Sequence, residues 1–402
     1  MHSSWKTAKI NQVCRVITGG TPSTAKPEYW NGEIPWITPM DLSKQGGKYI
    51  KKGSRSISKK GLAGSSAEKI PTDSIIMSSR APIGYLAINK QIITTNQGCK
   101  SFVCGGEIDV EYLYYYLAHH MDEVKRLGSG STFTEVGKKQ LENLNIKYPS
   151  VSAQKKIASI LSTTDGEIRK TDQIIQKTEV LKQGLMNELL TKGIGHKKFK
   201  KTKLGEIPEG WEAVAVGQLC DCIVPGRNKP KSFSGNIPWI TTPNIKDSRI
   251  DYKSNINFVS KEELIECGNK KIPINSVIMT CVGEFGIIAV VDQEISINQQ
   301  LHAFLPSNQV TPTFLRLSLV SQKEQMYNLA TKTSVPYLNK SNCNSILIAK
   351  PPIAEQEVVA KIICSIEDKV LANKKMLNQL IGKKNGLMHD IFSQKVRVNS
   401  YE

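Results

Sequence analysis

In two segments, Gln154 to Leu190 and Gln356 to Phe392, the positions at alternating steps of four and three are mostly apolar, and threonines, Asn373 and two lysines interrupt the series. This heptad spacing is typical of a helix that pairs with one other helix. Each helix would be roughly 55 Å long at about 1.5 Å per residue, with a stripe that is narrow for a globular core. We therefore expect the two segments to pack against each other. The seam residues are Ile157, Leu161, Ile168, Ile175, Leu185 and Leu189 in the first segment, and Val359, Ile363, Val370, Leu377, Leu387 and Ile391 in the second.

The two segments belong to a longer internal repeat. Ile34-Pro-Trp-Ile-Thr38 returns as Ile237-Pro-Trp-Ile-Thr241, and Gly184-Leu-Met186 returns as Gly386-Leu-Met388. A five-residue match that contains Trp and Pro does not arise readily by chance. The chain is therefore two copies of one unit about 200 residues long, each ending in a long helix.

Ahead of each long helix, short alternating segments predict a mostly β domain. In the first copy we expect strands at 34–38, 74–78, 84–88, 91–95 and 145–148 and a helix at 110–127. The predicted fold is thus α+β, with two pseudo-repeated, mostly β domains separated by the two long helices. The predicted boundaries are 1–150 for the first domain, 151–191 for its long helix, 192–203 for a basic linker, 204–352 for the second domain, 353–393 for the C-terminal long helix and 394–402 for a tail.

Charge narrows the choice of partner. The chain has 54 basic and 36 acidic residues, a formal net charge of +18, which favours a polyanion, and among polyanions nucleic acid. We expect no membrane partner, because no apolar run approaches 18 residues and residues 1–9 show no leader pattern. Nine scattered cysteines without a Cys-x-x-Cys pair indicate a reduced, cytoplasmic protein.

Familiar catalytic motifs are missing from the sequence. It has no P-loop, no Gly-x-Gly-x-x-Gly after a strand, no His-Glu-x-x-His, and no Asn or Asp followed by Pro-Pro and an aromatic residue. Cys220-Asp-Cys222 places two thiols on one side of a strand, which would be half of a zinc site, but nothing completes it. We therefore expect no catalytic residue, no metal site and no cofactor in this chain.

A binding surface is easier to find. Seven cations and no acid lie between Ser43 and Lys60, and glycines at 46, 47 and 53 predict a mobile loop. Such a loop can follow DNA phosphates, although a solvated basic loop would look the same. Pro225 to Gly235 is the basic loop of the second copy. Forked donors suit guanine and amides suit adenine, so the predicted DNA-binding residues are Lys44, Lys48, Lys51, Lys52, Arg55, Arg80, Arg227, Lys229, Lys231, Asn244 and Arg249, with Gln97 as a weaker candidate.

At this point the sequence resembles the specificity subunit of type I restriction-modification systems. The resemblance rests on the order and duplication of Gly19-Gly-Thr-Pro-Ser23, the two Ile-Pro-Trp-Ile-Thr segments, Ala153-Gln154, Gly184-Leu-Met186 and Leu204-Gly-Glu-Ile-Pro-Glu-Gly-Trp211. It implies two target-recognition domains that each read half of a bipartite duplex DNA site, held apart by an antiparallel coiled coil. The second copy lacks Gly-Gly-Thr-Pro-Ser, so its contact loop is expected to be placed differently.

The resemblance also implies that catalysis lies in other chains. Two methylation subunits would bring S-adenosylmethionine and modify adenine, and motor-nuclease subunits, where present, would use ATP and Mg²⁺ to cut unmodified DNA. The long helices would then act as a ruler between the half-sites and would dock the partners on their outer faces. Two other interpretations remain open at this stage, a methyltransferase or nuclease with a diverged site and an orphan specificity or scaffold protein.

Overall fold

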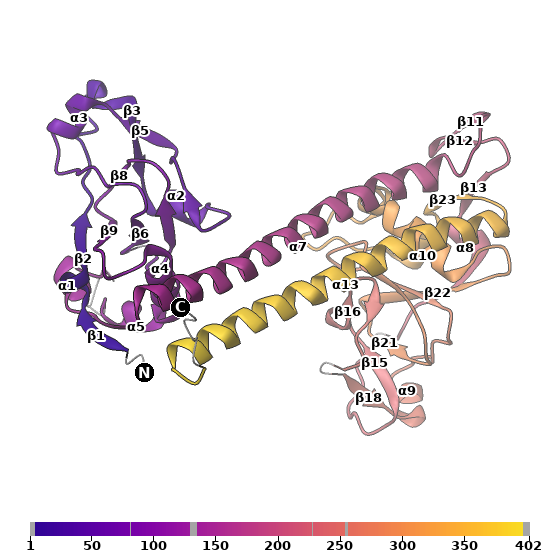
Figure 1. The fold of residues 1–402 in the computed structure, drawn as a ribbon. Coiled ribbons are helices and arrows are strands. Elements are labelled where there is room, and N and C mark those ends of the chain that lie inside the picture. Colours follow the sequence, from indigo (N-terminus) through magenta and orange to yellow (C-terminus); the bar gives the residue numbers. More distant parts are fainter. Residues whose placement is uncertain (1–4, 81, 129–134, 227, 254–255, 397–402) are drawn as a thin grey trace. The chain divides into compact units, whose positions relative to one another are not determined.

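The structure is a computed structural model that describes residues 5–80, 82–128, 135–226, 228–253 and 256–396. It divides into two compact units (Figure 1). The first unit is Met1–Lys170 with Leu377–Glu402, and the second is Thr171–Met376. Each unit therefore combines one copy of the repeated domain with a part of each long helix.

The first unit is built on a five-stranded sheet with the order β2-β9-β6-β7-β4. A smaller sheet has the order β5-β3-β8, and β1 pairs with β10. The strands are β1 (Lys6–Lys9), β2 (Cys14–Thr18), β3 (Trp30–Ile37), β4 (Tyr49–Ile50), β5 (Arg55–Ile57), β6 (Ile75–Ser78), β7 (Leu86–Asn89), β8 (Thr94–Thr95), β9 (Cys99–Cys104) and β10 (Asn145–Tyr148). The helices are α1 (Ile10–Val13), η1 (Pro27–Tyr29), α2 (Pro39–Ser43), α3 (Lys59–Ala63), α4 (Val110–His119), α5 (Met121–Arg126) and α6 (Lys138–Glu142).

The second unit repeats this plan. Its main sheet has the order β14-β22-β19-β20, and β18-β15-β21 forms the smaller sheet. The strands are β11 (Phe199–Thr202), β12 (Gly205–Pro208), β13 (Glu212–Ala215), β14 (Cys220–Ile223), β15 (Ile237–Ile240), β16 (Ile245–Lys246), β17 (Arg249–Ile250), β18 (Asn257–Val259), β19 (Val277–Thr280), β20 (Ile288–Val290), β21 (Ser296–Ile297), β22 (Leu301–Pro306) and β23 (Leu347–Lys350). The helices are α8 (Val216–Leu219), η2 (Thr242–Asn244), α9 (Lys261–Glu266), α10 (Pro312–Ser321), α11 (Lys323–Leu329) and α12 (Lys340–Asn344).

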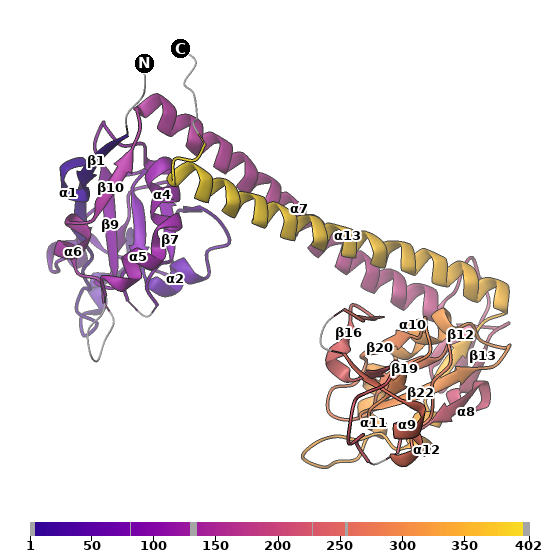
Figure 2. The same cartoon turned by 90° about the horizontal axis from the view of Figure 1, so that it is seen from below.

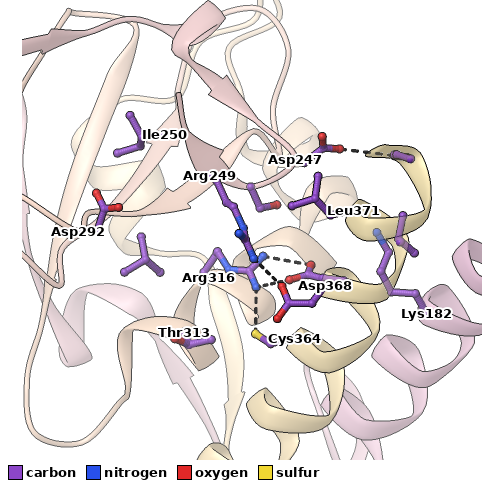
Figure 3. Close-up of a pocket in the computed structure, with 15 residues that line it drawn as sticks. Lys182, Asp247, Arg249, Ile250, Asp292, Thr313, Arg316, Cys364, Asp368 and Leu371 are labelled. Atoms are coloured by element: carbon purple, nitrogen blue, oxygen red, sulfur yellow. Dashed lines mark hydrogen bonds and ion pairs between the residues drawn. The ribbon is translucent and has the colours of Figure 1, made fainter. Parts of the chain in front are cut away.

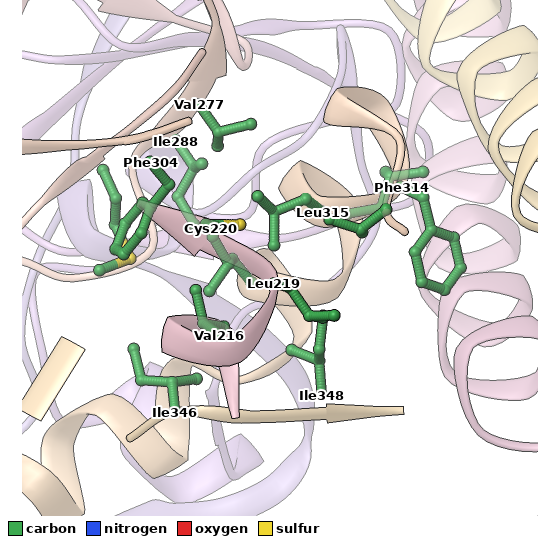
Figure 4. Packing of buried hydrophobic residues seen from close by; sticks show 14 of the residues in the cluster. Val216, Leu219, Cys220, Val277, Ile288, Phe304, Phe314, Leu315, Ile346 and Ile348 are labelled. Carbon is green, nitrogen blue, oxygen red and sulfur yellow. The ribbon is translucent and has the colours of Figure 1, made fainter. Parts of the chain in front are cut away.

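The core of each unit lies between its main sheet and the helix that comes after it in the chain. In the second unit, Val277 and Phe304 of the sheet pack with Leu315 of α10 and Ile348 of β23, as Figure 4 shows. In the first unit the corresponding helix α4 contributes tyrosines, among them Tyr112 and Tyr115, which are both fully buried. Burial of these large side chains removes apolar surface from water at about 25 cal/mol per Å², so this layer is a strongly stabilising contact of each unit.

The two long helices are α7 (Val151–Thr191) and α13 (Ile353–Phe392). Their segments lie side by side within each unit (Figure 2). In the first unit Lys384 Nζ lies 2.6 Å from Asp165 Oδ1, and in the second Lys374 Nζ lies 2.9 Å from Glu179 Oε1. Early residues of α7 thus meet late residues of α13 in the first unit, and the reverse holds in the second, so the segments run antiparallel.

Near the ends of the two long helices, the seam residues do more than the predicted pairing of one helix with the other. None of the twelve predicted seam residues is exposed, but those near the helix ends also join the domain cores. Ile157 and Leu161 pack into the core of the first unit together with Ile391. Leu189, Val359 and Ile363 join the core of the second. The helices are therefore part of each domain as well as partners of each other, and the predicted α+β fold with two repeated domains and a long helical pair is confirmed.

Two local predictions need correction. The helix expected at 110–127 is broken at His120 into α4 and α5. The basic linker 192–203 is not a plain tether, because β11 pairs with β12 as a hairpin. Gly205 makes that turn possible, since its φ of +91° lies in a region that side chains other than glycine rarely adopt.

No helix in the described part of the chain is both long enough and apolar enough to span a bilayer.

Candidate nucleic-acid interface

The basic segment after α2 is held by one carboxylate. Asp41 Oδ2 accepts a hydrogen bond from the backbone N–H of Thr38 at 2.9 Å, and Asp41 Oδ1 accepts one from the N–H of Ser54 at 2.8 Å. Burial, the largest single effect, would raise the pKa of Asp41, but the hydrogen bonds from Thr38 and Ser54 together lower it. Asp41 is therefore ionised at neutral pH and ties Ser54, within the segment, to the turn at Thr38 that precedes it.

This anchoring corrects the prediction of a mobile loop. The segment from Ser43 to Lys60 contains β4, β5 and the start of α3. Gly53 is needed here for close approach, because a Cβ at this position would lie 2.8 Å from Asp41 Oδ2 and 2.9 Å from the Trp36 carbonyl oxygen. The basic side chains are thus displayed from a defined backbone.

Four of the predicted DNA-binding cations in this segment are exposed, Lys44, Lys51, Lys52 and Arg55. The guanidinium carbon of Arg55 lies 3.6 Å from the centroid of the Trp30 ring, so the plane of Arg55 is oriented by a cation–π contact. Ion pairs within the described residues do not include these four side chains. Their charges remain available for phosphates.

Lys48 must be removed from this group. Its ammonium lies 2.9 Å from Glu111 Oε2 and also donates to Ser162 Oγ of α7 at 3.0 Å. The side chain is 6% exposed. Because this buried ammonium is paired with the Glu111 carboxylate, Lys48 serves to join the domain to the helix and does not face DNA.

A second candidate surface in the first unit surrounds Arg80. A Cβ at Gly98 would lie 3.1 Å from Arg80 Nε and 3.1 Å from Pro39, so the loops after β3, β6 and β8 converge there. Arg80 is 40% exposed and lies 3.5 Å from Glu135, while neighbouring Met40 is 65% exposed. Gln97 is exposed as well and is hydrogen-bonded to Thr21. These polar and apolar groups at one edge suit contact with base edges in a groove.

Asn244 also has to be corrected. It is 5% exposed, and its Oδ1 accepts hydrogen bonds from the N–H of Thr241 at 2.9 Å and from Thr241 Oγ1 at 2.7 Å. Asp41 makes the same bonds to Thr38 in the first unit. Asn244 therefore caps the turn after the repeated Ile-Pro-Trp-Ile-Thr segment and cannot read adenine.

Arg249 lies on the β16–β17 hairpin beside a pocket of about 430 Å³ in the second unit (Figure 3). It is 61% exposed and forms an ion pair with Asp368 of α13. Lys374 of α13 in turn lies 3.5 Å from Asp247 at the tip of the hairpin. The hairpin is thus held on the helix by two exposed ion pairs, each worth roughly 0–1 kcal/mol, and Arg249 is engaged with Asp368.

The basic loop of the second unit is anchored at both ends. The N–H of Gly226 donates to Asn269 Oδ1 at 2.6 Å, and a Cβ at Gly235 would clash with the backbone of Val259. Between these points Lys229 and Lys231 are exposed. Arg227, the remaining predicted residue, lies outside the described residues.

Sequence reasoning missed two contributors in the first unit. Arg169 of α7 is exposed and its guanidinium is the nearest group to Gly47, 3.7 Å from a Cβ built there. Arg169 lies on the side of the heptad repeat that faces away from the seam, and this was the sequence feature that could have identified it. Lys100, only 4% exposed, pairs with Glu135 at 3.0 Å and so supports the loops around Arg80. No local pattern marks a buried lysine in a strand.

Comparison with known proteins places these two domains in one family. The family model for the type I restriction modification DNA specificity domain matches residues 2–180 and 208–381. The MjaIX specificity subunit of Methanocaldococcus jannaschii is 30% identical over 98% of this chain and 94% of that protein, and the EcoBI specificity subunit of Escherichia coli is 21% identical over 99% of this chain and 86% of that protein.

A solved structure agrees with the fold. The S subunit of a type I restriction-modification system from M. genitalium aligns with a TM-score of 0.62 at 15% sequence identity, covering 99% of this chain and 98% of that chain. With both repeated domains matched by the family model, the chain belongs to the type I restriction-modification DNA specificity subunits.

Proposed function

We propose that this chain recognises a bipartite duplex DNA sequence for a type I restriction-modification complex, with one half-site read by each unit. The observation that supports this proposal is that the two units share a hydrogen-bonded turn but differ in the segments that follow it. Thr38 with Asp41 and Thr241 with Asn244 make the same bonds after the same motif. The segments after these turns differ, since the first unit displays a basic segment and the second a hairpin held on α13. Equal scaffolds with unequal loops suit two different short targets.

Catalysis is assigned to partner subunits in this proposal. Two methylation subunits would bring S-adenosylmethionine and methylate adenine, and motor-nuclease subunits would bring ATP and Mg²⁺. This chain contributes the choice of sequence in the cytoplasm, through cations that hold phosphates and side chains at loop edges that contact bases.

The outer faces of the long helices suit partner docking. On α7, Ile174, Val180 and Leu181 are 50%, 75% and 54% exposed. Ile174 and Leu181, seven residues apart, share one face of the helix, and Val180 lies about 100° around the helix from Leu181. Exposed aliphatic side chains of this kind are typical of a helix–helix interface. We propose that a helix of a methylation subunit packs there, and that Val180→Asp with Leu181→Asp would prevent assembly while leaving this chain folded.

The lengths of α7 and α13 would set the gap between the half-sites. Insertion of one heptad in each helix, after Lys170 in α7 and after Met376 in α13, keeps the seam in phase. The gap should then lengthen while both half-sites keep their bases. Altered half-sites at an unchanged gap would contradict this part of the proposal.

Mapping of methylated adenines in cells with and without this chain tests the proposal directly. Methylation at one bipartite sequence should depend on the chain, and exchange of residues 204–352 for those of a related subunit should change only one half-site. Methyl transfer by the purified chain alone would instead favour an enzyme. Binding without sequence preference after the methylation subunit is added would favour a scaffold.

A further inference from the structure

Three potential metal ligands meet inside the second unit. Cys281 follows β19, His302 lies on β22 and Cys343 lies on α12, and all three are buried. Their ligand atoms lie within 4.8 Å of one another. The Sγ atoms of Cys281 and Cys343 are 3.5 Å apart, and Cys343 Sγ is 3.4 Å from His302 Nδ1.

These separations match the edges of a metal tetrahedron. Thiolate sulfur lies about 2.3 Å and imidazole nitrogen about 2.0–2.1 Å from zinc, so tetrahedral ligands are separated by roughly 3.8 Å for two sulfurs and roughly 3.5 Å for sulfur and nitrogen. A disulfide would require about 2.05 Å between the sulfurs. The observed separations of 3.5 and 3.4 Å are close to these edges, and the distance between the sulfurs is too long for a covalent bond.

Cys222, on the strand where the sequence showed half of a zinc site, is the candidate for a fourth ligand. Cys222 is buried on β14 and belongs to the same core cluster as Cys281 and Cys343. With Cys222 the set would hold three sulfurs and one nitrogen, a combination that is common in structural zinc sites.

The first unit provides an internal comparison. Strand pairing identifies the equivalent positions. Cys222 matches Val16, because Cys222 pairs with Phe304 and Val16 with Phe102. His302 matches Lys100, because His302 pairs with Met279 and Lys100 with Met77. Cys281 N–H donates to the carbonyl of residue 300 as Ser79 N–H donates to that of residue 98. Cys343 in α12 corresponds to Leu141 in α6.

All four positions change together between the units. Val16, Ser79, Lys100 and Leu141 of the first unit are replaced by Cys222, Cys281, His302 and Cys343 of the second. In the first unit the Lys100 ammonium donates to Ser79 Oγ at 3.1 Å and pairs with Glu135. Tyr337 stands where Glu135 would be, as the bridges Arg80–Glu135 and Val282–Tyr337 show. The second unit thus has soft ligands in the place where the first unit has a buried cation and its carboxylate.

We propose that Cys222, Cys281, His302 and Cys343 bind one zinc ion in a closed structural site. The ion would occupy the place that the Lys100 ammonium takes in the first unit, and it would join β14, β19, β22 and α12 by coordination bonds. Four protein ligands leave no open position, so the site stabilises the second unit and takes no part in chemistry.

Metal analysis of the full-length chain tests this inference. The chain is purified without chelator or immobilised metal, dialysed against metal-free buffer and analysed by mass spectrometry for zinc. One tightly held zinc per chain is expected, and cobalt substitution should give the strong visible bands of tetrahedral Co²⁺ with a thiolate charge-transfer band. Absence of zinc together with absence of the thiolate–cobalt band would overturn the proposal, as would a Cys281–Cys343 disulfide in the freshly isolated chain.

Variants separate these ligands from other cysteines. Cys343→Ser and His302→Gln should lose the zinc, whereas Cys14→Ser, which alters the Cys14–Cys104 pair at 3.8 Å in the first unit, should retain it. A variant with the residues of the first unit, Cys222→Val, Cys281→Ser, His302→Lys, Tyr337→Glu and Cys343→Leu, should fold without zinc, which circular dichroism can verify. Zinc at the original stoichiometry in Cys343→Ser or in the fivefold variant would contradict the assignment.

Discussion

Gln154 and Gln356, 202 positions apart, make the same three hydrogen bonds. Oε1 of Gln154 accepts from the N–H of Asp109, and Nε2 donates to the carbonyls of Glu107 and Pro149, at 2.8 to 2.9 Å. Gln356 bonds Thr311, Gln309 and Pro351 in the same way, at 2.9 to 3.0 Å. Both side chains are fully buried. Each long helix is thus joined at its first turn to the start of the helix that covers the sheet.

Replacement of either glutamine should destabilise its own unit. Gln154→Ala or Gln356→Ala leaves a buried N–H and buried carbonyls without partners, at about 1–3 kcal/mol for each group. Hydrogen exchange should quicken around α4 for the first variant and around α10 for the second. Gln176→Ala is the control, because Gln176 is an exposed residue of α7 whose side chain bonds to Asp172 of the same helix. It should change hydrogen exchange around neither α4 nor α10. Equal effects in all three variants would refute the anchoring role.

The Lys48–Glu111 pair predicts an acid limit for the first unit. Burial, the largest effect, would raise the pKa of Glu111, but hydrogen bonds from Tyr49 and Lys48 lower it below its ordinary value of 4.5. A carboxyl group with a lowered folded-state pKa stabilises the fold above the unfolded pKa, and this contribution is lost as pH falls through the folded value. Stability of the first unit should therefore fall below about pH 4.5.

Glu111→Gln checks this assignment by thermal unfolding across pH 3 to 7. The variant should be less stable at pH 7 and should lose less stability on acidification than the original chain. Glu68→Gln is the matched control, because Glu68 pairs with Arg15 at the surface and is 57% exposed. An acid profile unaffected by Glu111→Gln would assign the acid sensitivity to other carboxylates.

Charge reversal at Lys51 and Lys52 should weaken DNA binding at every sequence. If each lysine neutralises one phosphate, the slope of log K against log salt should become shallower by about 1.8. The change should leave the order of preferred sequences intact, since phosphate contacts carry no direct sequence information.

Lys6→Glu with Lys147→Glu provides the control for net charge, because both lysines are exposed on the paired strands β1 and β10 of the same domain. Titration of labelled duplexes at several salt concentrations measures both variants. An identical salt slope in the Lys51 and Lys52 variant and the original chain would exclude this segment from the interface.

Arg316 and Glu367 give a fourth prediction. Arg316 of α10 has a 5% exposed side chain and reaches Glu367 of α13 with two hydrogen bonds, at 2.6 and 3.2 Å. Arg316→Ala should cost about 3–5 kcal/mol because it leaves a carboxylate without its buried partner. Arg316→Met combined with Glu367→Leu should recover most of that loss in thermal unfolding; a double variant as unstable as the single one would show that the pair matters for more than charge neutralisation.

Sequence patterns predicted what depends on periodicity and repetition. The seam residues, the long helices and the strand at 145–148 follow from spacing that local structure imposes. Lys48 and Asn244 were misassigned because burial of a polar side chain depends on partners far away in sequence, here Glu111 for Lys48, or on the geometry of a turn, here at Thr241 for Asn244. The Cys281, His302 and Cys343 cluster escaped notice because only the folded sheet brings such distant residues together.

The paired threonine caps at Thr38 and Thr241 have one more consequence. Each cap is satisfied by a side chain three residues later, so the turn after the motif is complete before the exposed loop begins. Loops that start from such a self-contained turn can accumulate substitutions or be exchanged between homologous genes with little penalty to folding. New target sequences can therefore arise by recombination of loops on an unchanged framework, and the two halves of the site are free to diverge independently.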